Sequence, residues 1–200
     1  MINALDLYAQ IHIFNLYPII DVLKNAYPDK KIEFAYENIF DEIKGFLQNS
    51  ENKTKHEEFS TQLLVLKDNI IQADKNIELQ KTDVGDLIRA LDFYTRIVIG
   101  QLWEVTLVLR MFVFDVDSKK LEMMEDCVTR IAADVFSLSK YSSYGIYNKS
   151  VPNDSRIMYE IQQVLRHELW KIGDKKYHTV DAYPAHHQSG YPLIGIETRI

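Results

Sequence analysis

The sequence is short of residues that interrupt helices and of residues that form cross-links. Its 200 residues include 7 glycines, 5 prolines and a single cysteine, Cys127. One cysteine excludes an intramolecular disulfide and a multi-cysteine zinc site, and it favours a reducing cytoplasm. Sparse glycine and proline favour long helices over many short strands. A chain of this length can bury about 70% of the surface that its unfolded form exposes, so it can fold without a disulfide or a metal.

Basic runs and long uninterrupted apolar runs are also missing. The net charge is −6, and no lysine–arginine cluster offsets it, which argues against binding of extended nucleic acid. The most apolar stretch, residues 97–114, contains Gln101, Glu104 and Arg110, and therefore predicts a buried helix and no membrane span. The first ten residues lack the basic segment of a secretory signal, so we expect a cytoplasmic protein.

Sequence signatures of common enzyme classes are missing as well. The chain contains no GxxxxGK[ST] phosphate loop, no GxSxG or GxGxxG, no CxxC and no HExxH. Cys127 lies between apolar positions of an expected helix, which predicts a core residue and not a nucleophile. The missing signatures favour a protein that is not an enzyme, and the sequence predicts no cofactor.

Apolar residues at helical spacing, by contrast, are abundant. The clearest stripe begins at Thr82 or Asp83, either of which can cap a helix, and it advances by three and four residues at a time. It predicts one continuous, central helix over about residues 83–112. The stripe consists of Val84, Leu87, Leu91, Tyr94, Val98, Leu102, Val105 and Leu109.

Weaker helical patterns flank this stripe, with a break at Pro18. Residues 60–81 fit either a small β-hairpin or the start of a helix. Residues 49–58 have no apolar side chain and predict a solvated loop, and residues 173–200 predict an irregular, extended C-terminal arm. The fold predicted is mainly α: a single domain over 1–200, built as a helical bundle around the central helix.

The loop "YSSYGIYNKS" is the first candidate site. Tyr141, Tyr144 and Tyr147 recur every three residues around a glycine. A tyrosine offers a flat apolar face and a polar tip, so such a loop can stack a base or bind a partner. The alternative is an ordered loop that closes one end of the bundle. Long loops tend to be functional, which keeps the binding interpretation open.

Two helical segments carry charged candidates. In "QVLRHELW", Arg166 and His167 point away from the apolar face; Arg166 can bind a phosphate or carboxylate, or both side chains can simply suit a helix C-terminus. In the central segment, the spacing of Arg89, Asp92 and Arg96 predicts a ladder of ion pairs, which either fixes the packing or lines a ligand site.

The C-terminal stretch "YHTVDAYPAHHQSGYPL" is the last candidate. His178, Asp181 and His186 are residue types that bind metals, but their spacing matches no known ligand pattern. Tyr177 and Tyr183 suit an arm that lies over the helices, with the prolines enforcing an extended chain. The arm interpretation is favoured over a metal site.

Three stretches together resemble a group of small bacterial and prophage proteins: "DLIRALDFYTRIVIGQLWEV", "SSYGIYNKSVPNDSRIMYEIQQVLRHELW" and the C-terminal stretch. That group shares a helix of the form "ALDFYSRI-GQ" and a late "YEIYQVIRH-LAW". The resemblance covers roughly the C-terminal 60% of the chain and implies a mobile-element setting. It carries over no catalytic residue.

The hypothesis that these observations favour is a non-enzymatic binding protein of a phage or mobile element, with a counter-defence role. It would sequester a host protein or a small nucleotide-like ligand through Tyr141, Tyr144, Tyr147, Arg166, His167, Tyr177 and Tyr183. The alternatives are a metal-dependent hydrolase that uses the late histidines, and a structural or assembly component. The apolar stripes suit packing within one chain or in a homo-oligomer equally well.

Overall fold

The computed structural model describes residues 1–13, 15–30, 32, 40–41, 44–45, 53–73, 78–112, 118–172 and 197–198. Within these residues the chain is a mainly α-helical bundle, as the sequence predicts. The helices are α1 (Ile2–His12), α2 (Tyr17–Ala26), α4 (Lys53–Gln72), α5 (Lys81–Val98), α6 (Trp103–Phe112), α7 (Ser118–Phe136) and α8 (Asn153–Ile172).

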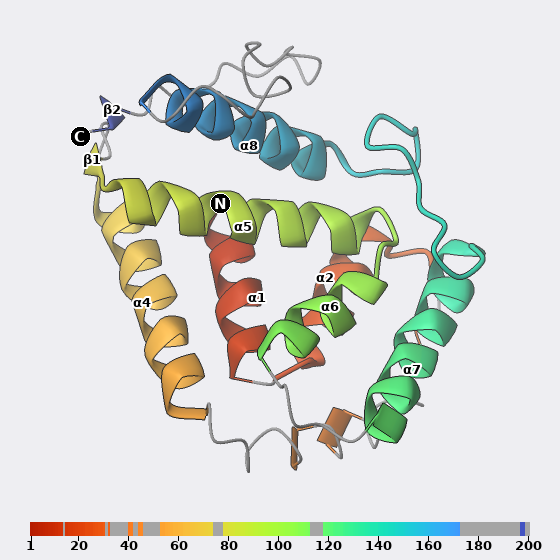
Figure 1. Ribbon diagram of the computed structural model, residues 1–200. Coiled ribbons are helices and arrows are strands. Elements are labelled where there is room, and N and C mark those ends of the chain that lie inside the picture. Colours follow the sequence, from red (N-terminus) through yellow and green to blue (C-terminus); the bar gives the residue numbers. More distant parts are fainter. Residues whose placement is uncertain are drawn as a thin grey trace.

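Helix α5 is the centre of the bundle. It crosses the molecule with α8 along one side and with α1, α2, α4 and α6 on the other, while α7 stands at the far end against α6 (Figure 1). Its N-terminus is closed by a capping box, in which the backbone N–H of Gln80 donates to Oδ2 of Asp83 at 3.3 Å. The sequence predicts the cap at Thr82 or Asp83. The helix instead begins at Lys81, and Asp83, in its first turn, accepts the capping hydrogen bond.

The predicted continuous helix over 83–112 is wrong, because the chain turns between Val98 and Trp103. Gly100 lies in the left-handed region with a φ of 94°, and the N–H of Gln101 donates to the carbonyl of Arg96 at 2.8 Å. Glycine suits this conformation because it has no Cβ to clash. The apolar stripe keeps its phase through the turn, since Leu102 and Val105 are buried like the residues of α5, so periodicity alone does not reveal the break.

Of the two interpretations left open for residues 60–81, the helix is correct as far as Gln72, and no hairpin forms among the described residues. Helix α4 covers residues 53–72, so the second half of the predicted 49–58 loop is helical too. Two short strands, β1 (Glu78–Leu79) and β2 (Glu197–Thr198), pair in parallel, Glu78 with Glu197 and Leu79 with Thr198. This pairing joins two segments far apart in the sequence.

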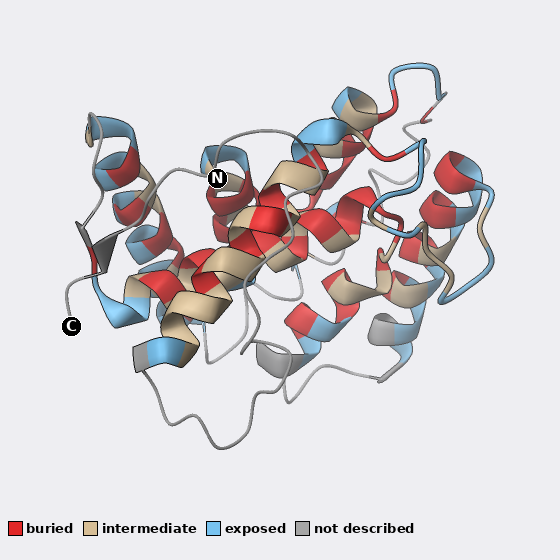
Figure 2. Cartoon of the chain, turned by 90° about the horizontal axis from the view of Figure 1, so that it is seen from above, coloured by how far each residue is buried: buried red, intermediate tan, exposed pale blue. Residues whose placement is uncertain are grey.

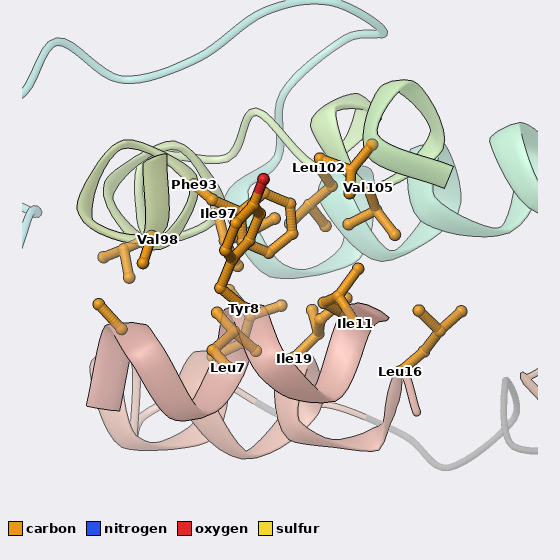
Figure 3. Close-up of a cluster of buried hydrophobic side chains, with 14 of the residues drawn as sticks. Leu7, Tyr8, Ile11, Leu16, Ile19, Phe93, Ile97, Val98, Leu102 and Val105 are labelled. Carbon is orange, nitrogen blue, oxygen red and sulfur yellow. The ribbon is translucent and has the colours of Figure 1, made fainter. Parts of the chain in front are cut away.

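The core forms where α1 meets α5 and α6. Tyr8 of α1 lies against Phe93 and Ile97 of α5, and Ile11 lies below Leu102 and Val105 (Figure 3). Buried residues gather where helices meet and exposed residues lie on the outer faces (Figure 2). Burying apolar side chains of this size stabilises the fold by about 1.5–3 kcal/mol each, and this is what holds α1 in place.

A cluster of rings lies where α1 meets α4. His12 and His56 are 1% and 4% exposed, and their ring centroids are 5.8 Å apart. Tyr8 and Phe59 pack edge-on against His12 at 4.7 and 4.6 Å. Burial first, then His56 and Arg89, lower the pKa of His12 from 6.5 to about 3, so this imidazole is neutral in the folded protein.

In the described part of the chain, no helix has both the length and the apolar character that a membrane crossing requires.

Candidate functional site

The candidate site is the loop over residues 139–151, which joins α7 to α8 and is called the tyrosine loop below. It runs outside the end of α5, between the top of α7 and the start of α8 (Figure 1). It follows Ser137 and includes Tyr141, which have positive φ angles of 56° and 64°. Turns closed by hydrogen bonds from Ser142 to Ser139 (3.0 Å) and from Asn148 to Gly145 (2.8 Å) give it a defined path.

Tyr144 fixes the middle of the tyrosine loop to the core. Its backbone N–H donates to the carbonyl of Ile99 at 2.9 Å, and its hydroxyl donates to the carbonyl of Phe136 at 2.9 Å. The ring packs edge-on against Phe136, with centroids 5.8 Å apart. This tyrosine therefore closes the end of the bundle, the role that the sequence left as the alternative for the whole loop.

A polar network ties the tyrosine loop to α5 and α6. Arg96 donates to Asp92 at 2.6 Å, to Gln101 at 3.0 Å and to Glu104 at 2.8 Å. Gln101 in turn donates to the hydroxyl of Ser143 at 3.1 Å. Burial works to lower the pKa of Arg96, but the hydrogen bonds and charges of Asp92 and Glu104 outweigh it, so the pKa is raised.

The same network reaches α8 through Gln162, which is 2% exposed. Its side-chain amide donates to Oδ1 of Asp92 at 2.8 Å. The sequence predicts ion pairs of Asp92 with both Arg89 and Arg96; the structure forms the second, while Arg89 pairs with Asp86 at 3.0 Å. One carboxylate thus connects α5 and α8, and the network as a whole links the tyrosine loop with α5, α6 and α8.

Tyr141 lies on the outer face of the tyrosine loop and is 60% exposed. Its hydroxyl donates to Glu125 on α7 at 2.5 Å, and its ring packs edge-on against Trp103 on α6, with centroids 5.7 Å apart. Glu125 also accepts from Arg110 at 3.0 Å and forms an ion pair with Lys140 at 2.9 Å. The hydrogen bond from Tyr141, followed by that from Lys140, lowers the pKa of Glu125, which keeps this carboxylate ionised.

Tyr147 is the second exposed aromatic side chain of the tyrosine loop, at 41%. It packs edge-on against Tyr159 of α8, with ring centroids 6.4 Å apart. Arg156 holds the end of the loop by donating to the carbonyls of Asn148 at 2.8 Å and Val151 at 3.0 Å. The two exposed tyrosines are therefore carried by a backbone that side chains fix from both ends.

Arg166 and His167 do not join the tyrosine loop. Both are half-buried on α8, and Arg166 lies about 20 Å along the helix from its first residue, Asn153, at the usual rise per residue. His167 stacks on Trp170 with ring centroids 5.9 Å apart. The structure thus separates these two residues from the tyrosines with which the sequence analysis grouped them.

The remaining predicted site residues lie outside the described residues: Tyr177, His178, Asp181, Tyr183 and His186. Among the residues that are described, no three His, Cys, Asp or Glu side chains come together as metal ligands would. Cys127 is buried on α7 as a core residue, and burial raises the pKa of its thiol to about 12.

Sequence reasoning missed the residues that support the tyrosines. Trp103 and Glu125 contact Tyr141 from α6 and α7, and Gln162 joins the polar network from α8; none of the three stands out in the sequence. The signal that was available for Gln162 is its place on the apolar face of α8, between Ile161 and Leu165. A polar residue at such a position predicts a buried hydrogen bond.

No protein-family model, curated protein or solved structure matches this chain.

Proposed function

We propose that the protein is a non-enzymatic binding protein and that the outer face of the tyrosine loop binds a protein partner. The observation that carries the proposal is the contrast between exposure and order in this loop. Tyr141 and Tyr147 are 60% and 41% exposed, yet they stand on a backbone held by Tyr144, Arg156 and the bond from Gln101. Large aromatic side chains presented without mobility lose little entropy on binding.

The charges around the tyrosine loop support a protein partner over a nucleotide-like ligand. The arginines nearby are already engaged: Arg96 by three acceptors, Arg110 by Glu125, and Arg156 by two loop carbonyls. A phosphate would have to displace these partners before it could bind in bidentate fashion. Exposed tyrosines with a polar surround are instead typical of the centre of a protein–protein interface.

The resemblance to prophage proteins supplies the biological setting of the proposal. Within it, the partner is a protein of the bacterial host, and binding by this chain sequesters it as a counter-defence measure. Small proteins without a catalytic site act by occupying a surface of their target, and a rigid aromatic loop suits that mode of action.

The test compares partner capture by the natural protein and by a Tyr141→Ala/Tyr147→Ala variant, using cross-linking in host cells and quantitative mass spectrometry. The matched control is Val65→Ala/Ile71→Ala on α4, which removes two apolar side chains that are each 55% exposed. We expect the tyrosine variant to lose partners that the control retains, with affinity about tenfold weaker or more.

Equal capture by all three proteins would show that the loop is not the binding surface. Tyr144 is left intact in this experiment because its two hydrogen bonds hold the loop to the core, so its removal would disturb the fold as well as the surface. Circular dichroism of each variant confirms that helicity is unchanged.

A further inference from the structure

The apolar surface at Tyr141 continues from the tyrosine loop onto α6. The ring of Tyr141 packs against Trp103, which is half-buried. Leu107 follows Trp103 by four residues, so the two side chains are neighbours on one face of α6, and Leu107 is exposed. Trp103, Leu107 and Tyr141 thus form one apolar surface, which is called the aromatic patch below.

Arg110 and Glu125 border the aromatic patch and hold it in place. Arg110 is the next residue in the row of α6 that contains Leu107, and it donates to Glu125 of α7 at 3.0 Å. Glu125 also accepts the hydrogen bond from Tyr141. A partner therefore meets apolar side chains that are already positioned, as at the centre of a protein–protein interface.

The tyrosine loop is a basic segment of an acidic chain. The net charge of the protein is −6, yet no aspartate or glutamate occurs between Asp134 and Asp154 in the sequence. Lys140 and Lys149 lie in this stretch, and both are exposed. Lys149 forms no ion pair with any other residue that the structure describes, so its charge is available to a partner.

The carboxylate that bonds to the tyrosine loop does not cancel this positive charge. Glu125 lies between two cations, Lys140 at 2.9 Å and Arg110 at 3.0 Å. Its side chain is only 15% exposed, whereas those of Lys140 and Arg110 are 43% and 45% exposed. The ammonium group of Lys140 also lies 5.2 Å from the centre of the Tyr141 ring. Glu122, the preceding acidic residue on this face of α7, lies about one turn farther from the loop. The border of the aromatic patch therefore presents cations.

The surroundings of Tyr147, the other exposed tyrosine, are similar. Lys149 follows it by two residues in the loop, and Arg156 bonds to loop carbonyls close by. Burial, and then Glu160, raise the pKa of Tyr147, but Glu160 is itself buried and is not presented to a partner. Both exposed tyrosines thus stand beside accessible cations.

We propose that the partner of the tyrosine loop is a protein that presents acidic side chains around an apolar centre. The apolar centre contacts the aromatic patch, and the acidic side chains pair with Lys140 and Lys149. This inference rests on the proposed function and specifies the partner. Charges at the rim of an interface act mainly on the rate of association and on specificity, while the apolar anchors supply most of the affinity. The rest of the acidic chain repels such a partner, so the basic loop also selects the face that is bound.

The experiment selects binders of the full natural chain from a surface-displayed library of random linear peptides. Binding of the selected peptides is then measured by biolayer interferometry at low and high salt. The variants compared are Tyr141→Ala/Tyr147→Ala, which removes the exposed rings, and Lys140→Gln/Lys149→Gln, which removes the positive charges and keeps side chains of similar polarity.

The matched control is Lys53→Gln/Lys81→Gln, far from the tyrosine loop in sequence. Lys53 forms an ion pair with Glu57 at 3.7 Å, just as Lys140 does with Glu125, and Lys81 is exposed, as Lys149 is. Both double variants therefore remove the same charge from the protein. A difference between them reports on the location of the lysines and not on net charge.

We expect the selected peptides to be enriched in aspartate and glutamate together with apolar residues. Lys140→Gln/Lys149→Gln should weaken their binding by about threefold to tenfold and reduce its dependence on salt, whereas the control should stay within about twofold of the natural protein. Tyr141→Ala/Tyr147→Ala should weaken binding by at least about tenfold.

The failure of this inference can be distinguished from the failure of the proposed function. Peptides that need the two tyrosines but have no acidic excess, or that bind both lysine variants equally, overturn the inference alone. Peptide binding that the tyrosine variant does not weaken, or the selection of no peptide, counts against both. A single-stranded oligonucleotide that binds with the same lysine dependence would identify a nucleic acid as the occupant and overturn the inference. So would a dimer of the natural protein that Lys140→Gln/Lys149→Gln dissociates, since the occupant would then be a second copy.

Discussion

The side chain of Arg96 forms hydrogen bonds with three other side chains. Its guanidinium donates to Asp92, Gln101 and Glu104, and through Asp92 it is connected to Gln162 on α8. Removing the arginine would leave two carboxylates close together with no cation between them. Because these groups are partly shielded from water, the loss is larger than for an exposed ion pair.

We predict that Arg96→Met lowers the free energy of unfolding by about 1–3 kcal/mol, as measured by urea denaturation. The matched control is Arg89→Met, because Arg89 pairs with Asp86 but is 63% exposed, and its loss should cost less than about 0.5 kcal/mol. Equal effects of the two substitutions would mean that the Arg96 network contributes no more than an exposed ion pair.

His12 makes stability depend on pH. In the unfolded chain its pKa is near 6.5, and in the folded protein it is about 3, so only the unfolded state takes up a proton between these values. The contribution to stability is complete above about pH 6.5 and decreases as the pH falls towards 3. At pH 5 the loss amounts to about 2 kcal/mol relative to pH 8.

His12→Leu should therefore reduce the difference in unfolding free energy between pH 8 and pH 5 by about 2 kcal/mol. Guanidinium denaturation at several pH values measures this difference. Phe59→Leu, which replaces a ring that packs on His12 but does not titrate, serves as the control and should leave the pH profile as it is. A profile for His12→Leu that parallels the natural protein would contradict the assignment.

At the scale of elements, the turn between α5 and α6 depends on Gly100. An added Cβ would lie 3.0 Å from Leu138 and 3.3 Å from Phe136, at a φ of 94° that other residues rarely adopt. Gly100→Ala should lower the free energy of unfolding by about 1–3 kcal/mol. Gly85→Ala, inside α5 with open space around its Cβ, should raise it by about 0.5–1 kcal/mol. Calorimetry that shows the same sign for both substitutions would contradict this account of the turn.

The positions of the helices could be read from the sequence because apolar spacing and capping residues act locally. The sequence predicts that the central helix begins at Thr82 or Asp83, and α5 begins at Lys81. The turn at Gly100 escaped prediction because the apolar residues on both sides continue one stripe. Helix α4 was ambiguous because its exposed residues Val65 and Ile71 blur the amphipathic pattern.

The candidate site could be predicted only in part, since its geometry depends on contacts between distant segments. A repeat of three tyrosines identified the loop, but it did not distinguish Tyr144, which points into the core, from Tyr141 and Tyr147, which are exposed. The bond from Gln162 to Asp92 spans 70 residues, and no local pattern encodes it.

For the whole molecule, the contacts between helices predict the order in which the helices unfold locally. Helix α5 packs on α1, α2, α6 and α8, whereas α7 packs mainly on α6. The free energy of the local unfolding that exposes an amide group to exchange rises with the number of contacts that must be broken. In hydrogen-exchange mass spectrometry we expect peptides from α5 to exchange slowest and peptides from α7 to exchange well before them. Faster exchange in α5 than in α7 would show that the bundle is not organised around α5.

The central place of α5 has a consequence for how the chain is made. Helix α1 ends at His12, yet the surface that buries Leu7, Tyr8 and Ile11 belongs to residues near Phe93 and Ile97. A ribosome must therefore release about a hundred residues before this face of α1 can pack on α5, although α4 (Lys53–Gln72) can pack on α1 earlier. Contacts so distant along the chain also slow folding. We therefore expect this face of the nascent α1 to be accessible to chaperones that bind apolar segments during translation.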